Sequence, residues 1–368
     1  MEIKIECDPQ IPVTPGFISL PSEIMKQSGA LEGQFLQLDS EGKTLLLQIT
    51  GPRSPDQTSA WVSQTDKDGL SAGPLEVKIP EITLGCDPEF FILWGQKQVC
   101  AATYLPFIGQ IGCDGSLGEL RPNYGLHESQ VIKSLSQLIE KLPKTLRKSA
   151  WAEGMPETGD NFSYEAHSYR DSVAAGFHVH LGIPPEILNT RKEFNRATLN
   201  HLVRCLDWYL SVPLILVEEN HSRRIGKSKY GQPGDYRSSN ITLEYRTPGG
   251  INLRSPTLAQ GLLGLALLVT ENVVARVKEA SQNFVNLNKL SEKDLYQIMP
   301  IPPAQKALEI LTSPNTHLAS KMMGGIRKEL HALPTFEKHQ QALQGIFRTV
   351  EEYQRPGPNI IHNWKERL

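Results

Sequence analysis

The spacing of hydrophobic and polar residues divides the chain into helix-like and strand-like segments. Apolar residues recur with the period of an amphipathic helix over 126–147, 191–211, 256–281, 302–312 and 335–354. The third range has Ser255 as a candidate N-cap and Pro256 in the first turn, an order that favours helix initiation. Several segments between these ranges alternate polar and apolar residues, as half-buried strands do. The pattern predicts a protein with both helices and strands.

Residues 1–62 predict a small β-rich module. Its sequence indicates a strand, a short helix opening at Pro21-Ser22, a second strand, a turn at Glu41-Gly42 and a third strand. The phrase ISLPSEIMKQSGALEGQFLQL resembles the looped-hinge hairpins of the AbrB/MazE swapped-hairpin type, which often bind DNA through basic residues. Here residues 1–80 hold eleven Asp and Glu against six Lys and Arg, so we expect a folding or dimerisation appendage instead.

A linker is predicted after this module. The stretch GPRSPDQTSAWVSQTDKDGLSAGP is rich in Gly, Pro, Ser and Asp, residues that punctuate regular structure. We place the linker at 63–82 and a second, larger domain at 83–368. The strand-like segments that carry candidate chemistry all lie in this larger domain.

Four of those segments place two selective polar residues on one face. In GFHVHLG, His178 and His180 share a face while Phe177, Val179 and Leu181 take the other. One such strand is typical of a half-solvated sheet. The four together are more specific, because they supply carboxylates, imidazoles and guanidiniums without any Lys, Ser or Gln at the paired positions. The pairs are Asp87 and Glu89, Glu119 and Arg121, His178 and His180, and Glu244 and Arg246.

Carboxylates gathered on one face require positive charge. Two such charges ~6 Å apart repel by roughly 3 kcal/mol at an effective dielectric near 20. Oxygen ligands with an imidazole suit Mg²⁺ or Mn²⁺, and the absence of thiol ligands from the set argues against structural zinc. Arginine matches a multiply charged phosphate through its planar fork. The combination indicates phosphoryl chemistry at a metal site.

These motifs resemble those of a known superfamily. GCDPEFFILWG is similar to the acidic metal-binding strand of glutamine synthetases, GFHVHLG to their HxH strand and ITLEYRTPG to their ExR strand. The order of motifs over about residues 83–260 looks most like the phage- and bacterium-borne COOH–NH₂ ligase family of the glutamine synthetase/glutamate–cysteine ligase superfamily. The resemblance implies an α+β fold, with a curved antiparallel sheet and helices on its outer face, and ATP-dependent amide bond formation through an acyl phosphate.

The resemblance also implies roles for individual residues. ATP and Mg²⁺ (or Mn²⁺) would be the cofactors, with His180 turned toward ATP phosphate and Arg246 stabilising the transferring phosphoryl group. Arg121 and Arg237 would complete the catalytic arginines, Arg237 also binding ATP. In the same loop, 223–237, Arg223 and Arg224 are either phosphate or carboxylate clamps or solvated charges. The implied metal ligands are Asp87, Glu89, Asp114, Glu119, His178 and Glu244.

The chain departs from the family pattern at two places in the first acidic strand. Asp87 stands where a glutamate is usual, which shortens its reach by about one methylene. Pro88 cannot donate to a sheet ladder, so we expect the strand to begin there or to lie at an edge. An ammonium-shielding loop like that of glutamine synthetase is not recognisable, which leaves the amine substrate open.

Two alternatives to the ligase remain open from the sequence. The same site would support a phosphotransferase that stops at phosphoryl transfer. A catalytically inactive scaffold is less consistent, because an idle cluster of acids costs stability without function. The substrates are undetermined: a small-molecule or peptide carboxylate and an amine both fit.

Composition and charge indicate which partners and which cell compartment to expect. Hydrophobic residues make up 39% of the chain, charged residues 21%, and the net charge is −2, so we expect neither nucleic acid nor a membrane as a partner. No signal peptide is recognisable, and the longest apolar run, 261–269, is too short to span a bilayer. The five cysteines are scattered, as suits the cytoplasm, and Cys86 and Cys113 are expected to be small buried residues. Trp94, Trp151 and Trp208 are expected to pack in the core, and a homo-oligomer is possible.

Overall fold

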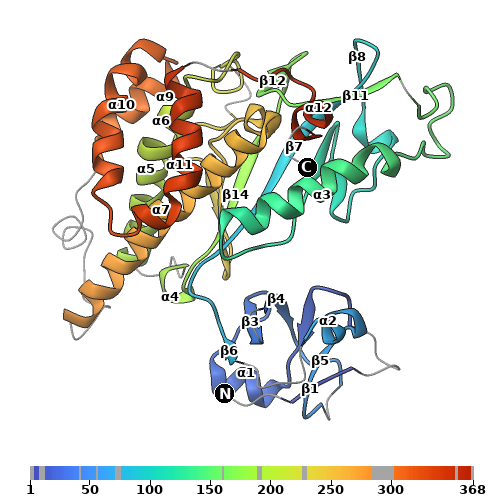
Figure 1. Cartoon of the computed structure of the whole chain (residues 1–368), viewed down its shortest axis with the longest axis vertical. Helices are drawn as coiled ribbons and strands as arrows, with labels where there is room; N and C mark the ends of the chain where they lie inside the picture. The colour runs from blue at the N-terminus through green and yellow to red at the C-terminus, as the bar shows by residue number, and fades with distance from the viewer. Residues whose placement is uncertain are drawn as a thin grey trace. The chain divides into compact units, whose positions relative to one another are not determined.

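The chain divides into two compact units. One comprises Met1–Thr83 with Gly182–Pro184, and the other comprises Leu84–Leu181 with Pro185–Leu368. Figure 1 traces the chain through both. The computed structural model describes residues 4–7, 13–40, 43–54, 57–70, 76–159, 161–188, 193–225, 230–283, 302–352 and 355–365.

The smaller unit is a six-stranded sheet with two short helices. The strand order is β1-β5-β2-β4-β3-β6, with β1 parallel to β5 and β2 parallel to β4. Alternate residues of β3 and β4 face inward, and Leu36, Leu38, Leu47 and Ile49 belong to the buried core of this unit. The elements are β1 (Ile5–Glu6), β2 (Phe17–Ser19), α1 (Ser22–Ser28), β3 (Phe35–Ser40), β4 (Lys43–Thr50), β5 (Ala60–Val62), α2 (Gln64–Asp68) and β6 (Glu76–Lys78).

The structure differs from the expected linker at 63–82, because part of that range is folded into the smaller unit. Ser63 caps α2 by accepting a hydrogen bond from the backbone N–H of Asp66 at 3.0 Å. β6 pairs with β3, with Val77 opposite Leu38. Ser, Asp and Gly are cap residues as well as linker residues, so composition could not separate the two readings. Residues 71–75, and the predicted turn at 41–42, lie outside the described residues.

The larger unit is built on an eight-stranded sheet. This sheet and the helices that pack on it confirm the predicted α+β class. Its order is β15-β16-β14-β7-β10-β9, with β8 and β11 also pairing with β7. The pairings of β7 with β8, β10 and β11, of β9 with β10 and of β15 with β16 are antiparallel. The strands are β7 (Thr83–Trp94), β8 (Lys97–Val99), β9 (Ile111–Asp114), β10 (Leu117–Leu120), β11 (Phe162–Glu165), β14 (Phe177–Gly182), β15 (Tyr236–Ser238) and β16 (Thr242–Tyr245), beside the small hairpin of β12 (Tyr169–Arg170) and β13 (Val173–Ala174).

Pro88 lies inside β7, between two neighbouring strands, so the prediction of a strand start or an edge at this position is wrong. The β7–β10 register covers Phe90 opposite Gly118 and Glu89 opposite Glu119. On the other side, the N–H of Glu89 donates to the carbonyl of Gly176 at 2.9 Å. Successive N–H groups of a strand point to opposite sides, so an N–H at position 88 would point toward β10. The paired residues of β7 and β10 end at Glu89, so proline stands just beyond the last pair, where the missing N–H is tolerated.

Helices cover the sheet, and most follow the predicted ranges. The predicted 126–147, 256–281, 302–312 and 335–354 correspond to α3, α7, α9 and α11, while 191–211 becomes α5 and a five-residue π-helix, with 191–192 outside the described residues. α4, α6, α10 and α12 were not predicted. The bounds are α3 (Glu128–Thr145), α4 (Pro185–Leu188), α5 (Glu193–Leu206), η2 (Asp207–Ser211), α6 (Val212–Leu214), α7 (Pro256–Asn283), α9 (Ala304–Thr312), α10 (Thr316–His331), α11 (Phe336–Glu351) and α12 (Ile360–Lys365), with short 3₁₀ turns η1 (Ala101–Thr103) and η3 (Gly250–Arg254).

α7 is the central helix of the larger unit. The hydroxyl of Ser255 caps it by accepting from the N–H of Leu258 at 3.2 Å, as predicted. It packs against α3 and α11, which lie beside it in Figure 1. Gly261 lets the helices approach, since a side-chain carbon there would overlap Ile346 of α11. By length and composition, Pro256–Ala280 is the one candidate membrane span in the described part of the chain, but 83% of its apolar window is buried, as in a core helix.

A buried ionic contact ties α3, α7 and α11 together. His339 of α11 is 1% exposed and lies between Glu128 of α3, at 3.3 Å, and Glu271 of α7, at 3.0 Å. Burial alone would lower the pKa of His339, but the two carboxylates raise it. The His339 imidazole therefore joins three helices that are distant in sequence.

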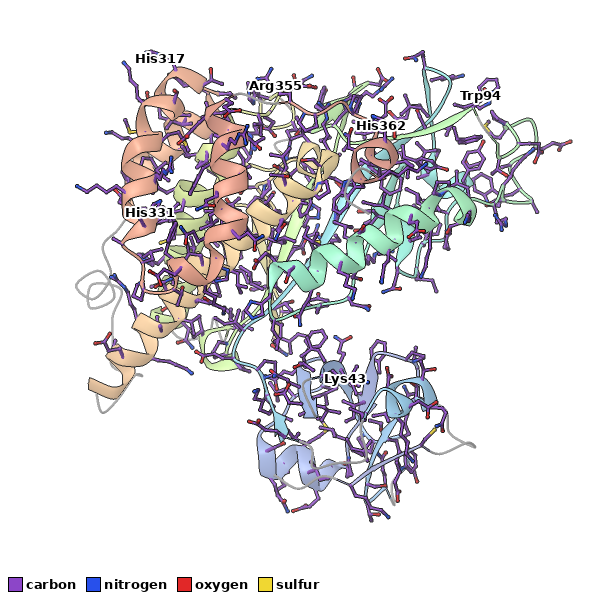
Figure 2. All side chains as sticks on the ribbon, viewed as in Figure 1. Lys43, Trp94, His317, His331, Arg355 and His362 are labelled. Atoms are coloured by element: carbon purple, nitrogen blue, oxygen red, sulfur yellow. The ribbon has the colours of Figure 1, made fainter. Side chains whose placement is uncertain are left out.

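The structure tests the expected burial of three tryptophans and two cysteines. Trp94 is 42% exposed and Trp151 is 70% exposed, so the expectation of core packing is wrong for both, while Trp208 is buried. Figure 2 labels Trp94, where β7 ends in a turn to β8. Cys86 and Cys113 are buried as expected, and burial raises the pKa of both thiols, which disfavours a nucleophilic role.

Candidate active site on four adjacent strands

The sheet order places the four polar pairs on neighbouring strands. β16, β14, β7 and β10 follow one another in the sheet, and they carry or adjoin Glu244 and Arg246, His178 and His180, Asp87 and Glu89, and Glu119 and Arg121. Glu89 and Glu119 are directly opposed in the β7–β10 register. Opposed residues share a face with Cβ atoms roughly 5 Å apart, so these two buried carboxylates are close neighbours.

Asp87 lies between the two histidines of β14. Its Oδ1 is 3.2 Å from His178 Nδ1, and its Oδ2 is 2.9 Å from His180 Nε2. Burial would raise the pKa of Asp87, but the two imidazoles hold it well below its usual range. The same contact raises the pKa of His180 against the effect of burial. Asp87 is thus held as a carboxylate.

Glu89 is almost fully buried and accepts hydrogen bonds from two sources. The N–H of Gly176 donates to Oε2 at 2.5 Å, and the hydroxyl of Tyr230 donates to the same oxygen at 3.2 Å. Position 176 requires glycine, because a Cβ there would overlap His178 Nε2 and lie 3.1 Å from the Tyr230 hydroxyl. Burial raises the pKa of Glu89, with His178 and these donors opposing the shift. A nearby cation would favour its charged form.

Glu244 and Arg246 extend the cluster across β14. Glu244 Oε1 is 3.8 Å from His178 Nδ1 and 3.1 Å from Arg246 Nε. The Arg246 guanidinium also lies over the ring of Tyr230, 5.2 Å from its centroid, and 3.9 Å from Asp235 Oδ1. It is partly exposed, which leaves it able to meet a ligand.

The Glu119 end of the site is paired with Arg121. The two side chains form an ion pair in which the carboxylate is buried and the guanidinium partly exposed. Arg121 also donates to the carbonyl of Gly109 at 3.0 Å. Asp114 lies further along: it is opposite Leu117 at the end of the β9–β10 hairpin, and its side chain is exposed. Asp114 therefore lies two residues along β9 from Gly112, the residue opposite the buried Glu119.

Arg223 and Arg224 do not sit in solvent, and the solvated-loop interpretation is wrong for both. Their exposed fractions are 0% and 3%, and both surround the buried Glu218. Arg224 Nη2 is 3.0 Å from Glu218 Oε2, and its Nη1 donates to the carbonyls of Gly231 at 2.6 Å and Thr247 at 2.9 Å. These bonds fasten the loop to the end of β16, which favours a structural role over a phosphate clamp.

Arg237 occupies a different environment. It lies on β15, opposite Glu244 in the β15–β16 register, and its side chain is exposed. The register places both side chains on the same face of the sheet. Arg237 is accordingly available at the rim of the cluster, whereas residues 226–229 of the same loop lie outside the described residues.

Sequence reasoning missed two residues that the structure adds to the cluster. Tyr230 follows no periodic pattern, and its only signal was its place in the glycine-rich loop. Tyr124 lies on the other side, with its ring edge-on to His180 at a centroid distance of 6.2 Å. A Cβ at Gly85 would overlap the Tyr124 ring, so the glycine of GCDPEFF makes room for it.

The donor types along these strands fit a hard divalent cation. Asp87 Oδ1 is buried and accepts no hydrogen bond from any described residue, so it lacks a compensating donor. Neighbouring ligands of an octahedral ion with bonds of about 2.1 Å lie about 3 Å apart, close to the 3.2 Å between Asp87 and His178. Within the described ranges, no three His, Cys, Asp or Glu side chains form a ready metal cage. Mg²⁺ commonly completes its shell with water and substrate phosphates, so a partial set of protein donors suits it.

The fold and the site together define an α+β protein with acids, imidazoles and arginines on adjacent strands of one sheet. A family model described as phage phiEco32-like COOH.NH2 ligase-type 2 matches residues 84–365. That match covers more than half of the chain, and the protein belongs to this family. The matched range coincides closely with the larger unit and includes all four strands of the cluster.

Two solved structures show a distant likeness to this chain. A bifunctional glutathione synthetase from Pasteurella multocida is 11% identical, with a TM-score of 0.36, over 74% of this chain and 52% of that one. A novel glutamine synthase homolog is 11% identical, with a TM-score of 0.34, over 87% of this chain and 78% of that one. The chain spans about half the length of the glutathione synthetase. Among curated proteins, no sequence matches this chain.

Proposed function

We propose that the protein is an ATP- and Mg²⁺-dependent carboxylate–amine ligase. A substrate carboxylate would attack the γ-phosphate of ATP, giving an acyl phosphate and ADP, and an amine would then displace phosphate to form the amide. The family match supports the ligase class. The observation that carries the proposal is the row of acids, imidazoles and arginines on four adjacent strands.

The roles of the residues follow from their chemistry. When bound, the metal–ATP complex supplies an activated phosphoryl group. His180 and the exposed Arg237 bind phosphate oxygens, and Arg246 holds the phosphoryl group through its planar fork. Arg121 keeps the charge of Glu119 balanced and extends toward the substrate. The residues proposed to hold the metal are Asp87, Glu89, Glu119, His178 and Glu244, with the exposed Asp114 as an outlying member.

The remaining assignments concern partners and setting. The substrates are proposed to be a small-molecule or peptide carboxylate and an amine. The five free cysteines are consistent with a reducing cytoplasm. We take residues 1–82 as a separate module that serves assembly, including a possible homo-oligomer, and residues 83–368 as the catalytic domain.

A panel experiment tests the ligase directly. Purified protein with ATP and Mg²⁺ is incubated with combinations of carboxylic acids and amines, and products are followed by mass spectrometry. Support is a product lighter than its two substrates by one water, with one ADP per amide. Glu89→Ala and Glu244→Ala should abolish it, while Glu352→Ala, an exposed carboxylate paired with Arg348, should not.

Isotope transfer separates the ligase from the phosphotransferase. With an ¹⁸O-labelled carboxylic acid, displacement of an acyl phosphate delivers one labelled oxygen to inorganic phosphate. A stable phosphorylated product with no amide and no labelled phosphate would instead establish a phosphotransferase. ATP binding with neither reaction across the panel would favour an inactive scaffold.

A further inference from the structure

A short loop before β9 presents two large apolar side chains to solvent. All residues of this 106–110 loop are exposed. Phe107 is 67% exposed and Ile108 is 81% exposed. Single apolar side chains on a protein surface are ordinary, but two adjacent ones with this much exposure form a small surface that favours contact with another apolar group.

This loop is fastened to β9 and β10 by hydrogen bonds. The carbonyl of Pro106 accepts from the N–H of Cys113 at 2.9 Å, and the carbonyl of Gln110 accepts from the N–H of Arg121 at 2.7 Å. The guanidinium of Arg121 donates to the carbonyl of Gly109 at 3.0 Å. The two apolar side chains therefore stand on a fixed backbone, which lowers the entropy cost of binding to them.

Gly112 shows which face of the sheet the 106–110 loop covers. Gly112 is opposite Glu119 in the β9–β10 register, and Glu119 is opposite Glu89 in the β7–β10 register. A Cβ at Gly112 would point to the face that carries these two carboxylates. It would overlap Arg121 Nη1 and lie 3.5 Å from the carbonyl oxygen of Ile108. The loop therefore lies over the face of the candidate active site, beside Arg121.

The distance from the loop to the cluster limits which ligand could reach both. Opposed side chains lie roughly 5 Å apart, which places the backbone of Ile108 on the order of 8–10 Å from the side chain of Glu119. An extended peptide advances about 3.3–3.6 Å per residue. A peptide whose C-terminal carboxylate lies beside Glu119 therefore brings the side chain two or three residues before its C-terminus to the loop.

We propose that the 106–110 loop is a docking surface for the carboxylate substrate, and that this substrate is a peptide with an apolar residue two or three positions before its reacting C-terminal carboxylate. The inference rests on the proposed function, because it takes that carboxylate to react beside Glu119. Phe107 and Ile108 cover the apolar side chain of the peptide. Partial burial of one leucine side chain in this way is worth about tenfold in affinity.

The test uses short acetylated peptide acids of glycine and serine with a single leucine, which is moved one residue at a time away from the C-terminus. Affinity is measured by titration calorimetry, with and without a non-hydrolysable ATP analogue. Reaction is measured separately with ATP, Mg²⁺ and hydroxylamine, which displaces phosphate from an acyl phosphate and leaves a hydroxamate. The use of hydroxylamine makes the result independent of the natural amine.

The variant that removes the docking surface carries Phe107→Ser and Ile108→Ser together. Both side chains are exposed, so folding should be retained, as circular dichroism would show. Leu308→Ser is the matched control, because Leu308 is also an exposed apolar residue, at 43%. It lies on α9, which packs against η2, α6 and α10 and not against the strands of the cluster.

Affinity and kcat/KM should be highest, by about tenfold, with leucine two or three residues before the C-terminus. This preference should disappear in the double variant and persist in Leu308→Ser. Absence of peptide binding, or a preference that is missing or survives the double variant, would overturn the proposal. So would a wild-type dimer that becomes monomeric in the double variant with unchanged peptide affinity, because the loop would then join two copies of the chain.

Failure of the proposed function would look different. Position-dependent binding that the double variant loses, without any hydroxamate, would uphold the docking surface and count against the ligase. Hydroxamate formed equally from every peptide would uphold the ligase and overturn the docking surface.

Discussion

Replacing Glu218 with glutamine should strongly lower the free energy of unfolding, although the side chain keeps nearly the same size. Glu218 is 2% exposed and meets Arg224 at 3.0 Å, His221 at 3.3 Å and Arg223 at 3.8 Å. Glutamine is nearly isosteric but neutral, so the variant leaves two buried guanidiniums without their opposing charge. Removing one partner of a buried ion pair costs about 3–5 kcal/mol.

The pKa of Glu218 gives a second measure of how much stability its charged form contributes. Burial would raise this pKa, but the cations, chiefly Arg224, lower it from 4.5 to about 2. A difference of about 2.5 units corresponds to roughly 3 kcal/mol of stability in the charged form. Because the folded pKa is depressed, this stabilisation is complete above pH 4.5 and is lost as the pH falls toward 2. The cost of Glu218→Gln should shrink over the same interval.

The assay is urea-induced unfolding followed by the helical circular dichroism signal, near pH 7 and near pH 3. We expect Glu218→Gln to lose about 3 kcal/mol at the higher pH and clearly less at the lower one. Glu352→Gln is the control, because its exposed pair with Arg348 is worth at most about 0.5 kcal/mol. A loss below about 1 kcal/mol near pH 7, or an equal loss at both values, would refute the reasoning.

Four further outcomes are expected. Gly176→Ala should cost about 1–3 kcal/mol in thermal unfolding by forcing the His178 ring aside, whereas Gly159→Ala, with nothing within 4 Å, should be neutral. The stabilisation from His339, whose pKa is raised, is present at low pH and lost as the pH rises through that pKa, so His339→Gln should flatten this part of the stability–pH curve. Arg246→Lys should lower kcat by roughly 10²–10³, about 3–4 kcal/mol, with a smaller change in ATP affinity, as initial rates would show. A chain lacking residues 1–82 should retain ligation, and salt-sensitive DNA binding by the intact protein that is lost with those residues would show their role to be misjudged.

The strand faces and most helices could be predicted because they depend on local periodicity. His178 and His180 share a face with any register, and Ser255 caps α7 through a bond to Leu258 only three residues away. The adjacency of the four strands could not follow from periodicity alone. It was expected only because the motif order resembles a known family.

What the sequence could not predict depends on contacts between distant segments. Arg223 and Arg224 look like solvated charges until Glu218 and the carbonyl of Thr247 are brought beside them. Pro88 looks like a strand breaker until the β7–β10 register is known to end at its neighbour. Tyr230 begins the loop sequence YGQPGDYR, but its contacts with Glu89 and His178 exist only because β7 and β14 lie side by side.

The burial of α7 also has a bearing on how the chain is made. This helix leaves the ribosome well before α11, which covers part of its apolar surface. At ~5–20 residues per second, the 52 residues between Asn283 and Phe336 take about 3–10 seconds to synthesise. During that interval α7 presents a surface that by length and composition would pass for a membrane span. Nascent chains halted before Phe336 should therefore be strong chaperone substrates and aggregate readily, whereas chains that extend past Glu351 should be released.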